Sequence, residues 1–205
     1  MDQAQIEQDL QLIKRTIKAS VRYTNIPPLG YLCSGIFGLA GPALTYLIIG
    51  ADKAGHPDLL TRTDLLALAG VWIGIMLAAL CSSAFFMARR ARKRKQAAWN
   101  SLSARIFLSQ LPVLLVAAIL TSALAGYGLV AMVPALWLLF WGLILFSFFF
   151  FTGTEHLLQS IIFIALGTAG LLVPFPVTLL LLAAGFGLIN LVWGIAGLVR
   201  GDAGK

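Results

Sequence analysis

The sequence predicts an all-α, polytopic membrane protein: a six-transmembrane-helix bundle with an N-terminal amphipathic helix at the cytoplasmic face or the membrane interface. Composition is the first reason, because 60% of the 205 residues are hydrophobic and 11% are charged, whereas a soluble domain carries roughly 25% charged residues. Patterning is the second, because the apolar residues form six tracts divided by polar, basic or turn-forming segments. The distribution of lysine and arginine is the third, because it assigns the sides of the membrane.

The sides are assigned by the run Arg89-Arg90-Ala91-Arg92-Lys93-Arg94-Lys95, which places six cations in seven residues between two apolar tracts. Moving this run through hydrocarbon would cost several kcal/mol per charge, so we expect it to stay in the cytoplasm. Six crossings then place both termini in the cytoplasm. Of the 15 lysines and arginines, only Lys53 and Arg62 fall outside the cytoplasmic segments. Topology therefore explains the net charge of +7, and no nucleic-acid partner is expected.

Residues 1–25 are predicted to form the amphipathic helix. Ile6, Leu10, Ile13 and Ile17 recur at spacings of four, three and four residues, which places them on one face of a helix. One interpretation is an interfacial helix whose apolar face enters the head-group layer. The other is a helix that pairs with a partner or a second copy through this stripe. The stripe is too short to decide between them.

The transmembrane domain is predicted over residues 26–200, followed by a C-terminal tail at 201–205. Its spans are expected at approximately 28–50, 65–88, 108–130, 133–151, 157–173 and 177–199. The turn between the third and fourth spans is very short, so these helices are expected to be antiparallel neighbours. Residues 89–107 are expected to form a cytoplasmic basic elbow.

Small residues predict where helices approach closely. Ser34 and Gly38 form a small-xxx-small pair in the first span, and Gly70 and Gly74 form a GxxxG pair in the second. Such pairs let neighbouring backbones come into contact in a membrane. We therefore expect both pairs at helix–helix interfaces.

A weak internal similarity links the first and fourth spans. It rests on two sets of residues with similar types and spacings, Pro28, Tyr31, Leu32 and Gly35 against Pro134, Trp137, Leu138 and Gly142. With three helices in each half, the two halves would be inverted relative to each other, as in several transporter folds.

The basic elbow is the predicted contact surface for lipid or for a protein partner. Anionic head groups attract each nearby cation with about 1 kcal/mol, and tryptophan suits the interface. The elbow could equally meet Glu7 and Asp9 of the N-terminal helix. The candidate contact residues are Arg89, Arg90, Arg92, Lys93, Arg94, Lys95 and Trp99.

The sequence carries no recognisable catalytic or metal-binding pattern. No ionisable residue lies in the interior of a span, and no metal-ligand spacing, nucleophile with a base or glycine-rich phosphate loop is present. Cys33 and Cys81 both lie in apolar tracts and do not form a CxxC motif. If their helices are antiparallel neighbours, the two cysteines lie at a similar depth below the cytoplasmic face and could approach each other. We therefore expect neither an enzyme nor a cofactor or metal site.

Three polar residues are candidates for sensing or ligand binding. Asn190, in the last span, is expected to hydrogen-bond across helices, with ligand binding as the alternative. Glu155 and His156 follow the fourth span, and Glu155 stands at capping-box spacing from Thr152. We expect Glu155 to cap a helix and His156 to lie at the interface, and the alternative is a sensor pair.

Three stretches carry a family resemblance. They are Arg22-Tyr23-Thr24 before the glycine-rich first span, the basic run with Trp99 and Ser103, and Gly185-Phe186-Gly187-Leu188-Ile189-Asn190 with Gly194. Together they resemble uncharacterised small bacterial inner-membrane proteins whose genes often lie beside winged-helix regulators. The resemblance implies an inner-membrane location and supplies no known activity. In that group a histidine commonly stands where Asn190 stands here, so a function tied to an intramembrane histidine is not implied.

These observations favour a non-enzymatic integral membrane protein that acts through partner contacts, in a sensory or regulatory role or as an assembly subunit. The alternative is a small channel or carrier for an uncharged or weakly polar solute, which the glycine-rich spans, the internal similarity and Asn190 favour. The partners considered are anionic lipid head groups, another protein and a second copy of the chain. We expect the chain in the bacterial inner membrane.

Overall fold

Helices provide all the regular structure in the described part of the chain. The structure, a computed structural model, describes residues 27–93, 101–152 and 154–202. Its α-helices are α2 (Pro28–Gly55), α3 (Arg62–Lys93), α4 (Ser101–Gly126), α5 (Val133–Thr152), α6 (Thr154–Gly170), α7 (Phe175–Leu182) and α8 (Asn190–Asp202). A π-helix, η3 (Ala183–Ile189), joins α7 to α8, and two 3-10 turns, η1 (Pro57–Leu59) and η2 (Val130–Met132), lie in loops. The predicted all-α fold is confirmed, while the N-terminal amphipathic helix lies outside the described residues.

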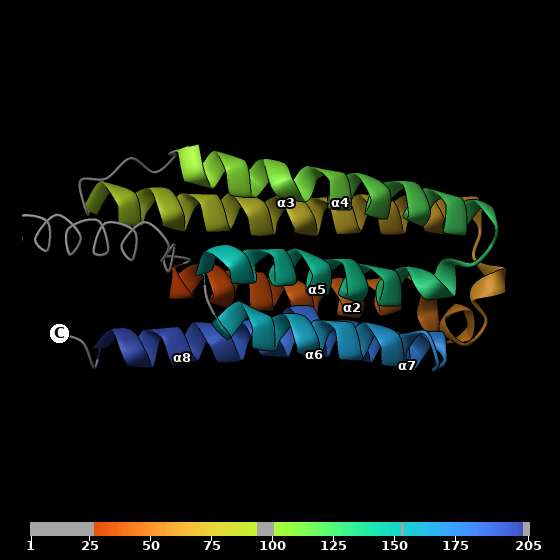
Figure 1. The fold of residues 1–205 in the computed structure, drawn as a ribbon. Coiled ribbons are helices and arrows are strands. Elements are labelled where there is room, and N and C mark those ends of the chain that lie inside the picture. Colours follow the sequence, from red (N-terminus) through yellow and green to blue (C-terminus); the bar gives the residue numbers. More distant parts are fainter. Residues whose placement is uncertain (1–26, 94–100, 153, 203–205) are drawn as a thin grey trace, which may run out of the picture.

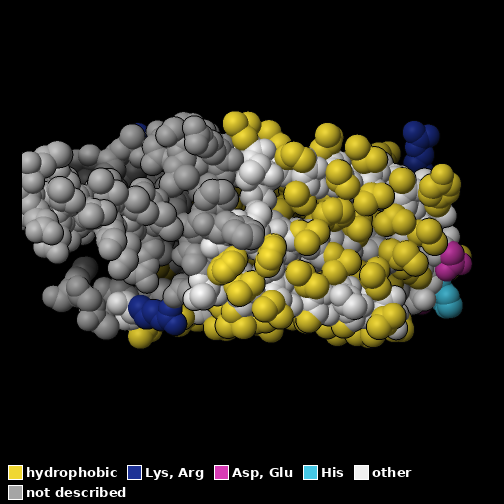
Figure 2. Space-filling model, in the orientation of Figure 1, with side chains coloured by type: hydrophobic (Ala, Val, Ile, Leu, Met, Phe, Trp, Pro, Cys, Tyr) yellow, Lys and Arg dark blue, Asp and Glu magenta, His cyan; other side chains and the backbone are white. Residues whose placement is uncertain are grey.

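Within the described ranges, five helical segments are long and apolar enough to cross a membrane. They are Pro28–Gly55, Arg62–Arg90, Phe107–Gly126, Val130–Phe149 and Phe175–Arg200. The remaining apolar helix, α6, has 17 residues and spans about 25 Å, against a hydrocarbon thickness of about 30 Å. The chain is therefore a multi-pass helical membrane bundle, and apolar side chains cover the visible face between its ends (Figure 2).

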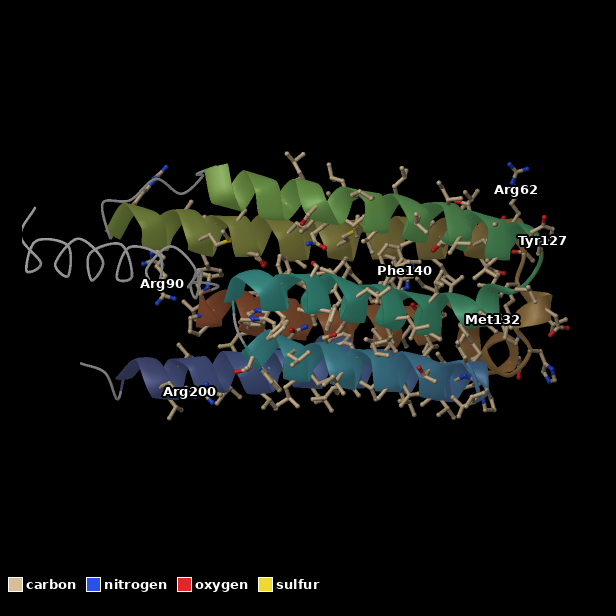
Figure 3. All side chains as sticks on the ribbon, viewed as in Figure 1. Arg62, Arg90, Tyr127, Met132, Phe140 and Arg200 are labelled. Atoms are coloured by element: carbon tan, nitrogen blue, oxygen red, sulfur yellow. The ribbon has the colours of Figure 1, made fainter. Side chains whose placement is uncertain are left out.

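The helices lie in three layers of roughly parallel and antiparallel rods (Figure 1). α2 and α5 form the middle layer, with α3 and α4 on one side and with α6, α7 and α8 on the other. α2 packs on α3 and on the η3–α8 segment, whereas α5 packs on α6 and on α4. Arg90 and Arg200 lie toward one end, which we name the basic end, and Arg62, Tyr127 and Met132 mark the opposite end (Figure 3).

Glycines bring α2 and α8 into direct contact. A Cβ atom at Gly35 would lie 2.7 Å from Cγ of Leu191, and one at Gly194 would lie 2.7 Å from Cγ of Leu32. Each helix therefore inserts a leucine against the glycine of the other. Antiparallel helices that carry Leu-x-x-Gly can pair in this reciprocal way, because the missing side chain makes room for the leucine.

The same arrangement recurs between α5 and α6. A Cβ atom at Gly142 would lie 2.6 Å from Cγ1 of Ile164, and one at Gly167 would lie 2.8 Å from Cγ of Leu139. The two middle-layer helices, α2 and α5, thus use the same small-residue contact with different partners.

The two predicted small-residue pairs have different outcomes. A Cβ atom at Gly38 would lie 2.2 Å from the carbonyl oxygen of Phe186, so Gly38 is needed where α2 meets η3. A Cβ atom at Gly70 or Gly74 would have nothing within 4 Å, and both glycines are exposed, so the expected packing of this pair does not occur among the described residues. The physical reason is that α3 turns a bulkier face toward α2, where Trp72 donates a 3.0 Å hydrogen bond to Thr45.

At the opposite end, an ion pair joins α2 to α3. Lys53 Nζ lies 2.6 Å from Asp64 Oδ2. That oxygen also accepts hydrogen bonds from the backbone N–H and the hydroxyl of Thr61, at 2.8 and 2.7 Å, and Thr61 Oγ1 accepts one from the backbone N–H of Asp64 at 3.3 Å. This Thr-x-x-Asp arrangement caps the start of α3. Gly50, at a φ of +74°, supplies the left-handed residue that ends the regular part of α2.

Candidate functional site

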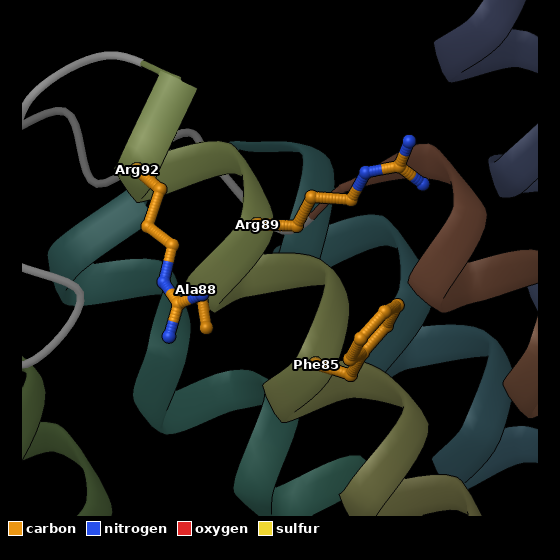
Figure 4. Close-up of a pocket in the computed structure, with 4 residues that line it drawn as sticks. All are labelled: Phe85, Ala88, Arg89 and Arg92. Carbon is orange, nitrogen blue, oxygen red and sulfur yellow. The ribbon is translucent and has the colours of Figure 1, made fainter.

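The basic end carries a pocket on α3. It has a volume of about 450 Å³ and is lined by Phe85, Ala88, Arg89 and Arg92 (Figure 4). These residues share one side of the helix because they are spaced three to four residues apart. Arg89 and Arg92 are exposed and leave the helix in different directions, and Phe85 lies one turn before Arg89. The pocket therefore combines two cations with an apolar wall.

α3 carries these arginines beyond its apolar part because no helix breaker intervenes. Residues 75–93 contain neither glycine nor proline, and the helix runs to Lys93. Arg89 and Arg92 form no ion pair with a described acidic side chain. Arg90, another predicted contact residue, is half-buried and lies in the same last turns of α3. The side chain of Lys93 and all of Arg94, Lys95 and Trp99 lie outside the described residues.

A second site is a group of buried polar side chains near the basic ends of α2 and α6. His156 is 9% exposed, and its Nε2 lies 3.1 Å from Tyr31 Oη. Its ring also approaches Phe148 of α5 edge to face, with the centroids 6.1 Å apart. The expected interfacial histidine is thus buried and bonded to α2. The side chain of Glu155 lies outside the described residues, so its capping role and the sensor pair stay predictions.

Gln159 and Ser160 follow on α6. Ser160 is fully buried and donates a 2.8 Å hydrogen bond to the carbonyl oxygen of Gly142. Gln159 is 1% exposed, and neither its Nε2 nor its Oε1 has a hydrogen-bond partner among the described residues. Burying an amide in an apolar environment without a partner costs several kcal/mol. Within the described part of the chain, the Gln159 carboxamide is therefore buried without a hydrogen-bond partner.

Gln110 is a second buried amide, but its nitrogen is bonded. Nε2 donates to Ser147 Oγ of α5 at 2.7 Å and to Ser109 Oγ at 3.0 Å, while Oε1 lacks a partner in the described structure. Gln110 thus joins α4 to α5 and belongs to the packing between these helices.

Asn190 serves its own helix. It is 7% exposed, and its Nδ2 donates a 2.8 Å hydrogen bond to the carbonyl oxygen of Phe186, four residues earlier. The expected bond across helices is therefore not the one that the structure contains. The reason is the π-helix, whose altered hydrogen-bond register ends at Asn190, where the side chain satisfies a carbonyl of the preceding turn.

Comparison of the chain with protein families, curated proteins and solved structures finds no match in any of the three. The chemistry of the sites must therefore be argued from their own geometry.

The two sites offer different chemistry. Guanidinium groups in the pocket bind carboxylates or phosphates, whereas the buried amide, hydroxyl and imidazole groups exchange hydrogen bonds with neutral partners. Within the described residues, no group of three His, Cys, Asp or Glu side chains is placed to hold a metal ion. Cys33 and Cys81 are free thiols.

Sequence reasoning missed two residues of the buried site. Tyr31 was named only in the internal similarity between the first and fourth spans, and Gln159 was not among the candidate site residues. The available signal was that Gln159 and Ser160 are polar residues in an otherwise apolar span, four residues or fewer after His156. Spacing of three to four residues places such groups on one helix face.

Proposed function

We propose that the protein is a non-enzymatic component of the bacterial inner membrane that acts through contacts at its basic end, in a sensory or regulatory role or as an assembly subunit. The observation that carries the proposal is the pocket in which Arg89 and Arg92, without acidic partners in the described chain, stand beside Phe85. The complementary partner is acidic at the level of the head groups and apolar just below it. A juxtamembrane helix of another protein has this chemistry.

Anionic lipid is the competing partner for the same pocket. A lipid phosphate would bind the guanidinium groups, and an acyl chain would contact Phe85. Crosslinking from the pocket in native membranes distinguishes the two partners, because it shows whether a lipid or a protein is bound there.

The proposed orientation places the basic end in the cytoplasm. It is supported by the charges at the two ends. The last turns of α3 carry Arg89, Arg90, Arg92 and Lys93, whereas residues 51–64 contain two cations and three acids. An excess of lysine and arginine marks the cytoplasmic side. The location in the inner membrane rests on the family resemblance.

Photo-crosslinking in native membranes tests the proposed contact. A photoreactive residue at Ala88, in the pocket, should capture a protein, and one at Leu59, exposed at the opposite end, should not capture the same protein. Replacing both Arg89 and Arg92 by alanine should abolish the crosslink, while Arg62→Ala should leave it unchanged. Capture of lipid alone, or a crosslink that persists in the double variant, would contradict the proposal.

A channel or carrier for an uncharged or weakly polar solute is the second candidate function. The packing pattern favours it. α2 contacts α3 of its own half and α8 of the other, and α5 likewise contacts α6 of its own half and α4 of the other. Two inverted repeats of three helices are expected to show this pattern, in which the first helix of each repeat also contacts the third helix of the other repeat. Proteoliposomes should then shrink and refill faster than protein-free liposomes when glycerol is added outside, whereas the partner-contact function predicts equal rates.

A further inference from the structure

Two polar side chains within four residues of Gln159 on α6 already have partners. Ser160 donates to the carbonyl oxygen of Gly142 at 2.8 Å, and Nε2 of His156 lies 3.1 Å from the Tyr31 hydroxyl. Neither these groups nor any other described group forms a hydrogen bond with Nε2 or Oε1 of Gln159. The carboxamide is thus unpaired among the described residues, and a group from outside the chain would satisfy it.

Gln159 lies close to the basic end, from which a small molecule would reach it. Gln159 lies about 8 Å along α6 from the first residue of the helix. Phe163, one turn further on, packs edge to face against Phe186 of η3, with centroids 5.2 Å apart. The aromatic pair lies on the side of Gln159 away from the basic end. π-helical turns such as η3 are found frequently at functional sites.

We infer that Gln159 is the recognition group of a ligand site inside the bundle, and that the ligand is a small uncharged molecule with a hydrogen-bond acceptor beside a donor, as in a primary amide or a urea. The ligand acceptor receives an N–H from Nε2 while the ligand N–H donates to Oε1, so both unpaired atoms are satisfied together.

The ligand is uncharged because no buried acidic, lysine or arginine side chain is described in this part of the bundle. The other polar side chains buried in the described structure are Thr45, Gln110, His156, Ser160, Thr178 and Asn190. None is a carboxylate, a lysine or an arginine, and an ion buried without a partner of opposite charge is strongly disfavoured. This site does not depend on the proposed function, because a sensor, an assembly subunit and a carrier could each bind such a molecule.

Thermal unfolding of the full chain in lipid nanodiscs tests the site, with acetamide as the probe. N,N-dimethylacetamide is the matched solute, because it keeps the carbonyl acceptor and lacks the N–H donors. Acetamide should raise the midpoint of the wild-type protein by a few degrees relative to dimethylacetamide at the same concentration. Gln159→Leu should remove this difference and should raise the midpoint without solute, because the unpaired amide is gone.

Gln110→Leu is the control variant, because Gln110 is a buried amide whose nitrogen is bonded within the chain. It should keep the difference between the two solutes. If Gln159→Leu does not fold, Gln159→Met, which keeps the length of the side chain, replaces it. Equal midpoints for the wild type in the two solutes, or an unchanged difference in the Gln159 variant, would overturn the inference. Both results would leave the contact proposed for Arg89 and Arg92 intact.

Discussion

Tyr31 and His156 join two helices through side chains that are 125 residues apart in the sequence. The contact lies near the start of both helices, at the basic end. Hydrogen bonds between membrane helices contribute about 0.6 kcal/mol on average and about 1.7 kcal/mol at most. One such bond therefore aligns the helices more than it stabilises the whole bundle.

Tyr31→Phe tests this bond. The variant keeps the ring and removes the hydroxyl, so we expect a loss of about 0.5–1.5 kcal/mol of stability. Tyr127→Phe is the control, because Tyr127 is 82% exposed and should tolerate the change. The midpoint of thermal unfolding in mild detergent measures both variants, and equal midpoints would contradict a role for the Tyr31 hydroxyl.

Asp64→Asn tests the connection at the opposite end. The variant removes the charge that Lys53 contacts at 2.6 Å and weakens the capping box with Thr61. We expect a lower unfolding midpoint, and we expect the difference from wild type to shrink at high salt because exposed charges are screened. Asp58→Asn, an exposed acid in the same loop, should change the midpoint less. An equal effect of the two substitutions would show that the loop charge, not the contact, matters.

At the scale of elements, glycines decide which helices are partners. α2 meets α8, and α5 meets α6, through leucine or isoleucine side chains placed against glycines of the facing helix. Apolar surface drives association weakly in a membrane, because lipid is as apolar as the protein, so close packing must distinguish one partner from another. Glycines that face nothing, such as Gly70, do not contribute to this choice.

Gly38→Ala and Gly70→Ala form a matched pair that tests this account. The new methyl group at position 38 would meet the Phe186 carbonyl oxygen at 2.2 Å, a backbone atom that cannot rotate away. We expect a loss of about 1–3 kcal/mol, as for other overpacked sites. At position 70 the methyl group meets nothing, so alanine should leave stability unchanged or raise it by about 0.5–1 kcal/mol through helix propensity. Unfolding midpoints in detergent would refute the packing account if the two variants behaved alike.

At the scale of the whole molecule, charge orients a bundle whose body is apolar. Arg89, Arg90 and Arg92 of α3 lie at one end, and the segment of residues 51–64 at the other end mixes acids and bases. The energetic cost of moving the basic run through the bilayer favours one orientation over its inverse.

Cysteine labelling tests this orientation. In a background with Cys33→Ser and Cys81→Ala, we introduce Gly55→Cys at the opposite end or Arg92→Cys at the basic end. A membrane-impermeant maleimide should label position 55 in intact cells, and should label position 92 only after the membrane is permeabilised. The reverse pattern would contradict the cytoplasmic placement of the basic end.

Composition and charge could predict the helical membrane class and the basic end, and five of the six predicted spans coincide with helices long and apolar enough to cross a membrane. The candidate site was harder to predict. Arg89 and Arg92 of the pocket were among the predicted contact residues, because a charge run next to an apolar tract can be recognised in the sequence, although the pocket itself was not predicted. The buried amide was not, because the burial of Gln159 depends on how α6 is rotated toward its neighbours.

By itself, the sequence determined that this chain is a helical membrane protein with one strongly basic end, because transfer free energy and charge act on each residue wherever the helices pack. Only the tertiary structure decided that Gly38 is covered while Gly70 is open, that Asn190 bonds within its own helix, and that Gln159 is buried with no partner among the described residues. The physical reason is that lipid and protein interior are both apolar, so hydrophobicity does not mark the inner face of a membrane helix. That face is set by close packing between residues that are far apart in the chain.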